Sequence, residues 1–195
     1  IIYFNENSKD INNLDSIKIL VLGGSQAAKV FAEKLPQIFK RCKEENIPLK
    51  IYQQCLKNQN QKISEFYKNS NIDFEIFNFS SNITHYFSKV NLAITRSGAS
   101  MLSELTNAKI PFISVPLPTS ADNHQLKNAT YYKNKFFGYL IEEKDINNKL
   151  FYLIKTIFED KSLLEKIKIN QRQYSDKNVF KNINLELEKI IDENY

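Results

Sequence analysis

The sequence predicts an α/β domain in which helices cover both faces of a parallel sheet. Short runs rich in Ile, Val and Phe alternate with longer segments whose apolar residues recur at helical spacing, which is the pattern of repeated strand–helix units. Glycines follow two of the expected strands, at residues 23–24 and at Gly98. The 195 residues are 42% hydrophobic and 25% charged, so a single globular domain over residues 1–195 is expected.

The first half of the chain supplies three of the expected strands. The first covers residues 17–22, and the apolar residues that follow the glycines predict a helix ending near Glu45. The next expected elements are a strand over residues 49–53, a helix over 56–69, a strand over 73–79 and a short helix over 83–88.

The second half repeats the order of strand, glycine turn and helix. Residues 96–98 join a buried strand over 92–95 to a helix over 99–108. A strand over 112–115, a proline-bounded loop over 116–121, a helix from Asp122 and a short strand over 139–141 should follow. From Asp145 onward the chain should be helical, with one apolar stripe formed by Ile183, Leu187, Ile190 and Ile191.

Composition excludes several classes of protein. No apolar run approaches the ~20 residues of a membrane-spanning helix, and the longest, residues 110–117, contains two prolines. The net charge of +5 comes from scattered lysines, with only three Arg among 27 basic residues, which favours a solvated lysine surface over nucleic-acid binding. Cys42 and Cys55 lack the spacing of a zinc or redox site. They are expected to be free thiols in the cytoplasm.

The start of the chain is informative about its origin. The first residues lack both an initiator Met and the basic and apolar regions of a signal peptide. An interior start predicts that the chain is a fragment of a longer protein.

Three loops are candidates for ligand binding: residues 23–26, 96–99 and 122–125. In an open α/β sheet, ligands bind outside the carboxyl ends of the strands, where helix amino termini offer unpaired N–H groups and about half a positive charge. The first glycine pair alone is also compatible with a purely steric turn. Residues 23–28 read Gly-Gly-Ser-Gln-Ala-Ala. They match neither the dinucleotide fingerprint nor the lysine-containing phosphate loop of nucleoside triphosphatases.

The three loops lie within a set of four motifs that follow one another along the chain. The sequence reads Leu-Gly-Gly-Ser-Gln at residues 22–26, Thr-Arg-Ser-Gly-Ala-Ser-Met-Leu-Ser-Glu-Leu at 95–105, Pro-Phe-Ile-Ser-Val-Pro-Leu-Pro at 111–118 and Asp-Asn-His-Gln-Leu-Lys-Asn-Ala at 122–129. This order closely resembles the carboxy-terminal domain of the MurG family, the N-acetylglucosaminyltransferases that convert lipid I into lipid II in peptidoglycan synthesis. The resemblance runs from about Ile17 to the end of the chain.

The resemblance implies a Rossmann-like domain that is one half of a GT-B glycosyltransferase. In this family the carboxy-terminal domain binds UDP-N-acetylglucosamine (UDP-GlcNAc), and an amino-terminal domain, absent here, binds lipid I at the cytoplasmic face of the inner membrane. Donor binding without transfer is therefore expected, and no catalytic residue is assigned to the chain. No cofactor or metal is expected, because the sequence has no Asp-x-Asp pair and the start of a helix can stabilise the leaving diphosphate.

The resemblance also implies roles for individual residues. Gly24 and Ser25 would contact the phosphates, and the amides of Ala99 and Ser100 the diphosphate and sugar. Glu104 would accept the ribose hydroxyls. The remaining expected contacts are Phe79 and Ser80 for uracil, Arg96 for phosphate, and His124, Gln125 and Asn128 for the GlcNAc hydroxyls.

Each of these roles has a structural alternative. Glu104 could be a solvated carboxylate, His124 a helix-start residue, Asn128 a structural amide and Arg96 a tie across its own turn. His85 is expected to be structural or exposed.

The sequence departs from the family pattern at three positions. Ala27 stands in place of Gly, and Ser100 and Met101 stand in place of Leu and Thr. A threonine hydroxyl near the diphosphate is thereby replaced by a thioether, which donates no hydrogen bond.

The alternative functions are another GT-B enzyme that uses a UDP-sugar, such as a UDP-GlcNAc 2-epimerase or a different glycosyltransferase, and a non-catalytic nucleotide-sugar-binding module. A nicotinamide-dependent oxidoreductase ranks below these.

Overall fold

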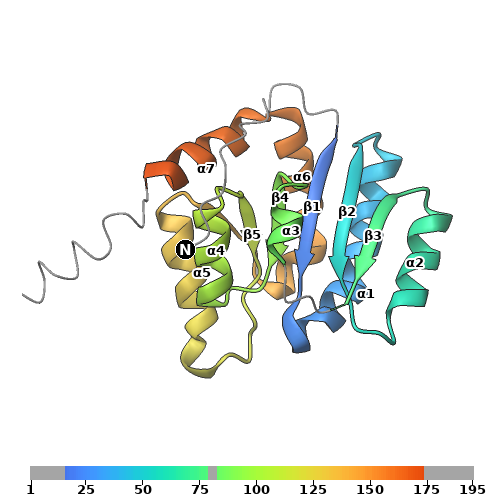
Figure 1. Cartoon of the computed structure of the whole chain (residues 1–195), viewed down its shortest axis with the longest axis horizontal. Coiled ribbons are helices and arrows are strands. Elements are labelled where there is room, and N and C mark those ends of the chain that lie inside the picture. Colours follow the sequence, from blue (N-terminus) through green and yellow to red (C-terminus); the bar gives the residue numbers. More distant parts are fainter. Residues whose placement is uncertain (1–15, 79–82, 174–195) are drawn as a thin grey trace, which may run out of the picture.

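The computed structural model of the chain describes residues 16–78 and 83–173, except for the side chains of residues 24–28. Within these ranges the protein forms a six-stranded sheet in the order β3-β2-β1-β4-β5-β6, and every neighbouring pair is parallel (Figure 1). The strands are β1 (Ile17–Leu22), β2 (Leu49–Gln54), β3 (Asp73–Phe77), β4 (Leu92–Thr95), β5 (Phe112–Ser114) and β6 (Gly138–Leu140). The predicted α/β fold with a parallel sheet is confirmed.

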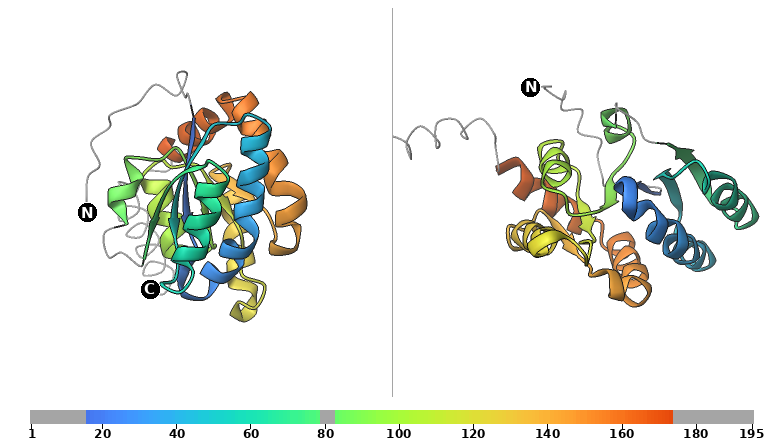
Figure 2. Two further views of the ribbon diagram at one scale, coloured as in Figure 1. Left: turned by 90° about the vertical axis from the view of Figure 1, so that its right-hand side faces the viewer. Right: turned by 90° about the horizontal axis from the view of Figure 1, so that it is seen from below.

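Helices cover both faces of the sheet, as the two views of Figure 2 show. One face carries α1 (Gly24–Glu44), α2 (Asn60–Asn69) and α6 (Ile146–Glu159), whose apolar residues form one core cluster with the sheet. The opposite face carries α3 (Thr84–Phe87), α4 (Ala99–Asn107) and α5 (His124–Asn134), which contribute to a second cluster. Helix α7 (Ser162–Gln173) follows α6 and contacts both α6 and α4.

The strand order places a topological switch between β1 and β4. From β1 the chain passes through α1 on one face to β2, and from β4 it passes through α4 on the other face to β5. Adjacent strands whose connections leave on opposite faces open a crevice at their carboxyl ends. The turn at Gly23, which joins β1 to α1, and the turn at residues 96–98, which joins β4 to α4, both start at this edge of the sheet.

Most predicted elements are present, but two helices begin later than predicted. Helix α2 begins at Asn60 rather than at residue 56, because Cys55 still donates its N–H to the Phe77 carbonyl at 2.9 Å and residues 56–59 form a turn. Helix α5 begins at His124 rather than at Asp122. Asp122 and Asn123 have φ values of 48° and 54°, in the left-handed region, which a right-handed helix cannot include, so α5 starts only after the short turn η2 (Ala121–Asn123).

The carboxy-terminal helical region is divided. Asp160 ends α6, and its Oδ1 accepts the Ser162 N–H at 3.0 Å, so α7 is a separate helix. The predicted apolar stripe of residues 183–191 lies outside the described residues. Within the described ranges, no helix combines the length and apolar character needed to cross a bilayer.

Both cysteines are free and buried. Desolvation raises the pKa of the Cys42 thiol to about 12, and it raises the pKa of the Cys55 thiol to about 12 as well. The two residues pack in the core cluster that includes α1 and α2. This agrees with the expectation of unpaired thiols.

Candidate functional site

Helix α4 begins at the switch point with its first turn open. Gly98 precedes it with φ −65° and ψ 136°, and no side chain in the described part of the protein caps the turn. A Cβ added at Gly98 would meet no described atom within 4 Å. The first internal bond of the helix runs from the Leu102 N–H to the Gly98 carbonyl at 3.1 Å. The amides of Ala99 and Ser100 therefore have no acceptor within the helix, and both residues are exposed.

Glu104 lies on the same face of α4 as Ser100, because the two residues are four positions apart. The residue is exposed, and its carboxylate makes no ion pair or hydrogen bond with the described residues. The carboxylate is thus available to hydroxyl donors beside the open turn. Met101, in contrast, is partly buried and packs against the core cluster beneath α4.

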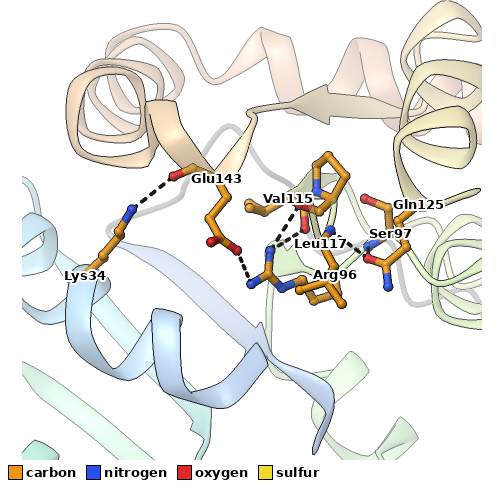
Figure 3. Close-up of polar contacts among 8 residues, drawn as sticks. Lys34, Arg96, Ser97, Val115, Leu117, Gln125 and Glu143 are labelled. Carbon is orange, nitrogen blue, oxygen red and sulfur yellow. Dashed lines mark hydrogen bonds and ion pairs between the residues drawn. The ribbon is translucent and has the colours of Figure 1, made fainter. Parts of the chain in front are cut away.

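Arg96 is buried and points toward Glu143 and the loop after β5 (Figure 3). One terminal nitrogen, Nη1, donates to the carbonyls of Val115 at 3.2 Å and Pro116 at 3.1 Å. The other, Nη2, lies 2.5 Å from Oε2 of Glu143, and the Phe31 ring centroid is 5.0 Å from the guanidinium carbon. Arg96 thus joins the loop after β4 to the loop after β5. These contacts correspond to the structural role that the sequence leaves open for this residue.

Two amide side chains of α5 hold the same loops together. The Oε1 atom of Gln125 accepts the N–H groups of Ser97 at 3.2 Å and Leu117 at 3.0 Å (Figure 3). The Nδ2 group of Asn128 donates to the Ser97 carbonyl at 3.0 Å. Because only oxygen can accept the two N–H groups, they fix the orientation of the Gln125 amide. Its Nε2 group makes no hydrogen bond with the described residues and can donate to a ligand.

The remaining predicted site residues differ in where the structure places them and in whether it describes them. His124 is exposed, and its Nδ1 lies 2.8 Å from the Ala121 carbonyl oxygen, which is a helix-start contact. Gly24 and Ser25 form the first turn of α1 at the same edge of the sheet, but their side chains are not described. Phe79 and Ser80 lie outside the described residues. His85 is exposed on α3 and packs edge-on against Tyr86.

Sequence reasoning missed the partners that organise this edge. Glu143 belongs to a short turn, η3 (Glu143–Asp145), which precedes α6. Its carboxylate holds Arg96, and its backbone carbonyl accepts the Lys34 ammonium of α1 at 3.1 Å. No motif marks Glu143 or Lys34, because each is joined to its partner only by the fold. Among the described residues, no group of three or more His, Cys, Asp or Glu side chains could hold a metal ion.

The chain is similar to known proteins over most of its length. The family model described as "Glycosyltransferase family 28 C-terminal domain" matches residues 18–183. A Pelagibacter ubique (strain HTCC1062) relative is 38% identical over 191 residues, covering 96% of this chain and 53% of that protein. A Rickettsia bellii (strain RML369-C) relative is 37% identical over 164 residues, covering 77% and 46%. Both are named UDP-N-acetylglucosamine–N-acetylmuramyl-(pentapeptide) pyrophosphoryl-undecaprenol N-acetylglucosamine transferase.

Solved structures show the same likeness. The Acinetobacter baumannii MurG structure superposes with a TM-score of 0.73 at 26% identity, covering 85% of this chain and 48% of that one. The kitacinnamycin glycotransferase, at a TM-score of 0.59 and 12% identity over 88% of this chain and 43% of that one, shares the fold alone. The chain spans about half the length of the curated relatives that it matches.

Proposed function

Because this chain belongs to glycosyltransferase family 28 as its carboxy-terminal domain, we propose that it binds UDP-GlcNAc for a transferase that converts lipid I into lipid II. The observation that carries the proposal is the open start of α4 at the switch point, with Glu104 on the same face as Ser100. Transferase names on the Pelagibacter and Rickettsia relatives support this donor and acceptor. They also favour the transferase over an epimerase.

The proposed donor lies across the start of α4. The diphosphate accepts hydrogen bonds from the amides of Ala99 and Ser100, where the positive end of the helix favours negative charge. The Glu104 carboxylate accepts the two ribose hydroxyls, since a carboxylate has room for two donors. The free Nε2 group of Gln125 donates to a hydroxyl of the sugar. Uracil recognition is assigned to residues 79–80.

The proposed reaction is inverting transfer, in which an acceptor hydroxyl attacks the anomeric carbon and UDP leaves. The contribution of this chain is to stabilise the leaving diphosphate with fixed N–H groups, which need no reorganisation as charge develops. The general base and the lipid I site are assigned to residues beyond this chain. The acceptor in the relatives' name is linked to undecaprenol, so we place the full-length protein at the cytoplasmic face of the inner membrane.

Substitution of Glu104 tests the proposal directly. Titration of the unmodified chain with UDP-GlcNAc should give saturable heat, and Glu104→Gln should weaken binding about 10-fold to 100-fold, because hydrogen bonds to a charged group contribute about 1.5–3 kcal/mol. The melting temperature without ligand should stay the same, since the side chain makes no described contact. A flat titration of the unmodified chain at millimolar UDP-GlcNAc would sink the proposal.

Two comparisons sharpen this test. With 2′-deoxy-UDP as ligand, the Glu104→Gln substitution should cost much less, because one of the hydroxyls that the carboxylate accepts is missing. UDP-GlcNAc should bind more tightly than UDP-GalNAc and UDP-glucose, which differ from it at the C4 hydroxyl and the acetamido group respectively. Equal affinity for all three sugars would favour a general nucleotide-binding module.

A further inference from the structure

The ion pair between Arg96 and Glu143 is almost enclosed. The Arg96 side chain is 8% exposed and the Glu143 side chain is 21% exposed. Glu143 reaches this position from η3, and Lys34 of α1 fixes its backbone through the 3.1 Å bond to its carbonyl (Figure 3). An enclosed pair depends strongly on both partners, because removal of one leaves a buried charge without compensation.

A continuous series of contacts leads from this pair to the sugar end of the proposed site. The guanidinium held by Glu143 donates to the carbonyls of Val115 and Pro116. The next N–H, that of Leu117, donates to Oε1 of Gln125 at 3.0 Å. We infer that Glu143 is a positioning residue for sugar recognition, which acts through Arg96 and the loop after β5 to orient the Gln125 amide. The inference rests on the proposed function.

The effect should be selective for the sugar. Without the carboxylate, Arg96 turns toward water or another acceptor, the carbonyls of Val115 and Pro116 lose their donor, and the Leu117 N–H shifts. The Gln125 amide then keeps only its bond from Ser97 and can rotate. The first turn of α4 is closed by its own bond from Leu102 to Gly98, so its amides keep their place. Diphosphate binding should therefore change less than sugar binding.

The experiment compares UDP-GlcNAc with UDP, which lacks the sugar, on the full chain and its Glu143 variants. Glu143→Ala should weaken UDP-GlcNAc about 10-fold and UDP by less than about threefold, within the range of coupling between linked sites. Glu143→Gln retains an acceptor oxygen and should recover part of the affinity ratio. Glu142→Ala is the matched control. Its side chain is 45% exposed, and among the described residues its carboxylate pairs with Lys144 alone, at 3.0 Å, so both affinities should remain unchanged.

Each outcome decides the inference. Equal loss of both ligands in Glu143→Ala, or an unchanged ratio, overturns it, because a purely structural role would not separate sugar from diphosphate. Circular dichroism checks that the variant is folded. If Glu143→Ala is unfolded, the ratio is read from Glu143→Gln and from Lys34→Met, which removes the tie to the Glu143 carbonyl and should shift the ratio in the same direction. Failure of the unmodified chain to bind UDP-GlcNAc overturns the proposed function together with this inference, whereas normal binding with a constant ratio overturns the inference alone.

Discussion

Gly98 tests the open start of α4, and Gly138, in β6, provides the matched comparison. A methyl group at Gly98 has free space and an allowed backbone, with φ −65°, but it would project where the diphosphate is proposed to lie. Gly98→Ala should therefore weaken UDP binding about 10-fold or more. Stability should change by less than about 1 kcal/mol, because lower entropy of the unfolded chain offsets the poorer N-cap residue. Titration and thermal unfolding measure the two effects.

Gly138→Ala should behave in the opposite way. An added Cβ would lie 2.5 Å from both Cδ2 and the backbone oxygen of Phe112, so the backbones of β5 and β6 would have to separate. Overpacking of this kind costs about 1–3 kcal/mol. Donor affinity in the fraction that remains folded should be preserved. If Gly98→Ala leaves UDP affinity unchanged, the diphosphate does not approach this turn.

The buried thiols predict how stability depends on alkaline pH. Burial raises the pKa of Cys42 and Cys55 from 9.0 to about 12, so the folded state disfavours the thiolates. The stability that comes from a raised folded-state pKa is fully present below pH 9 and is lost as the pH rises toward 12. The free energy of unfolding, measured by urea denaturation, should fall between pH 9 and 11. The double variant Cys42→Ala, Cys55→Ala should show a smaller fall, and an equal fall would assign the effect to other groups.

At the scale of elements, the sequence predicts strands better than helix starts. The bounds of β1 and β4 were predicted in full because each is a compact apolar run that ends at a polar or glycine turn. Helices α2 and α5 begin later than their apolar spacing indicates. At α5 the cause is the left-handed backbone of Asp122 and Asn123, which asparagine and aspartate tolerate but which no apolar pattern reveals.

The candidate site, too, could be predicted from the sequence only in part. The α4 turn could be predicted, because Gly98 and the two exposed residues after it, Ala99 and Ser100, are contiguous in the sequence. The partners of Arg96 could not, since Glu143 lies 47 positions away and only the packing of η3 beside the sheet edge brings the two together. Likewise, sequence resemblance assigned Gln125 and Asn128 to the sugar, whereas in the structure both amides also hold the loop at Ser97. A residue that supports a loop leaves no local pattern when its partner is distant.

At the scale of the whole molecule, the strand order brings the loops after β1, β4 and β5 to one edge of the sheet. Side chains from α5 and η3 then tie the β4 and β5 loops together in the free chain. A site that is held in place before binding spends little free energy on ordering loops, so more of the interaction energy appears as affinity. This arrangement suits a domain whose proposed task is to present a donor to a separate acceptor site.

The division of labour predicts that this chain binds donor but does not transfer it. A saturating ligand that binds only the folded state stabilises it, by about 2.7 kcal/mol at 100 times its dissociation constant, so UDP-GlcNAc should raise the melting temperature by about 5–10 °C. With UDP-GlcNAc and a lipid I analogue, the same preparation should release no UDP above background, because the proposed base lies elsewhere. The Pelagibacter relative is 38% identical to this chain over 191 residues, so addition of that relative's amino-terminal half tests whether transfer can be restored. Turnover by the chain alone would place the acceptor site and the base within these residues, and the donor-binding assignment would have to be extended to catalysis.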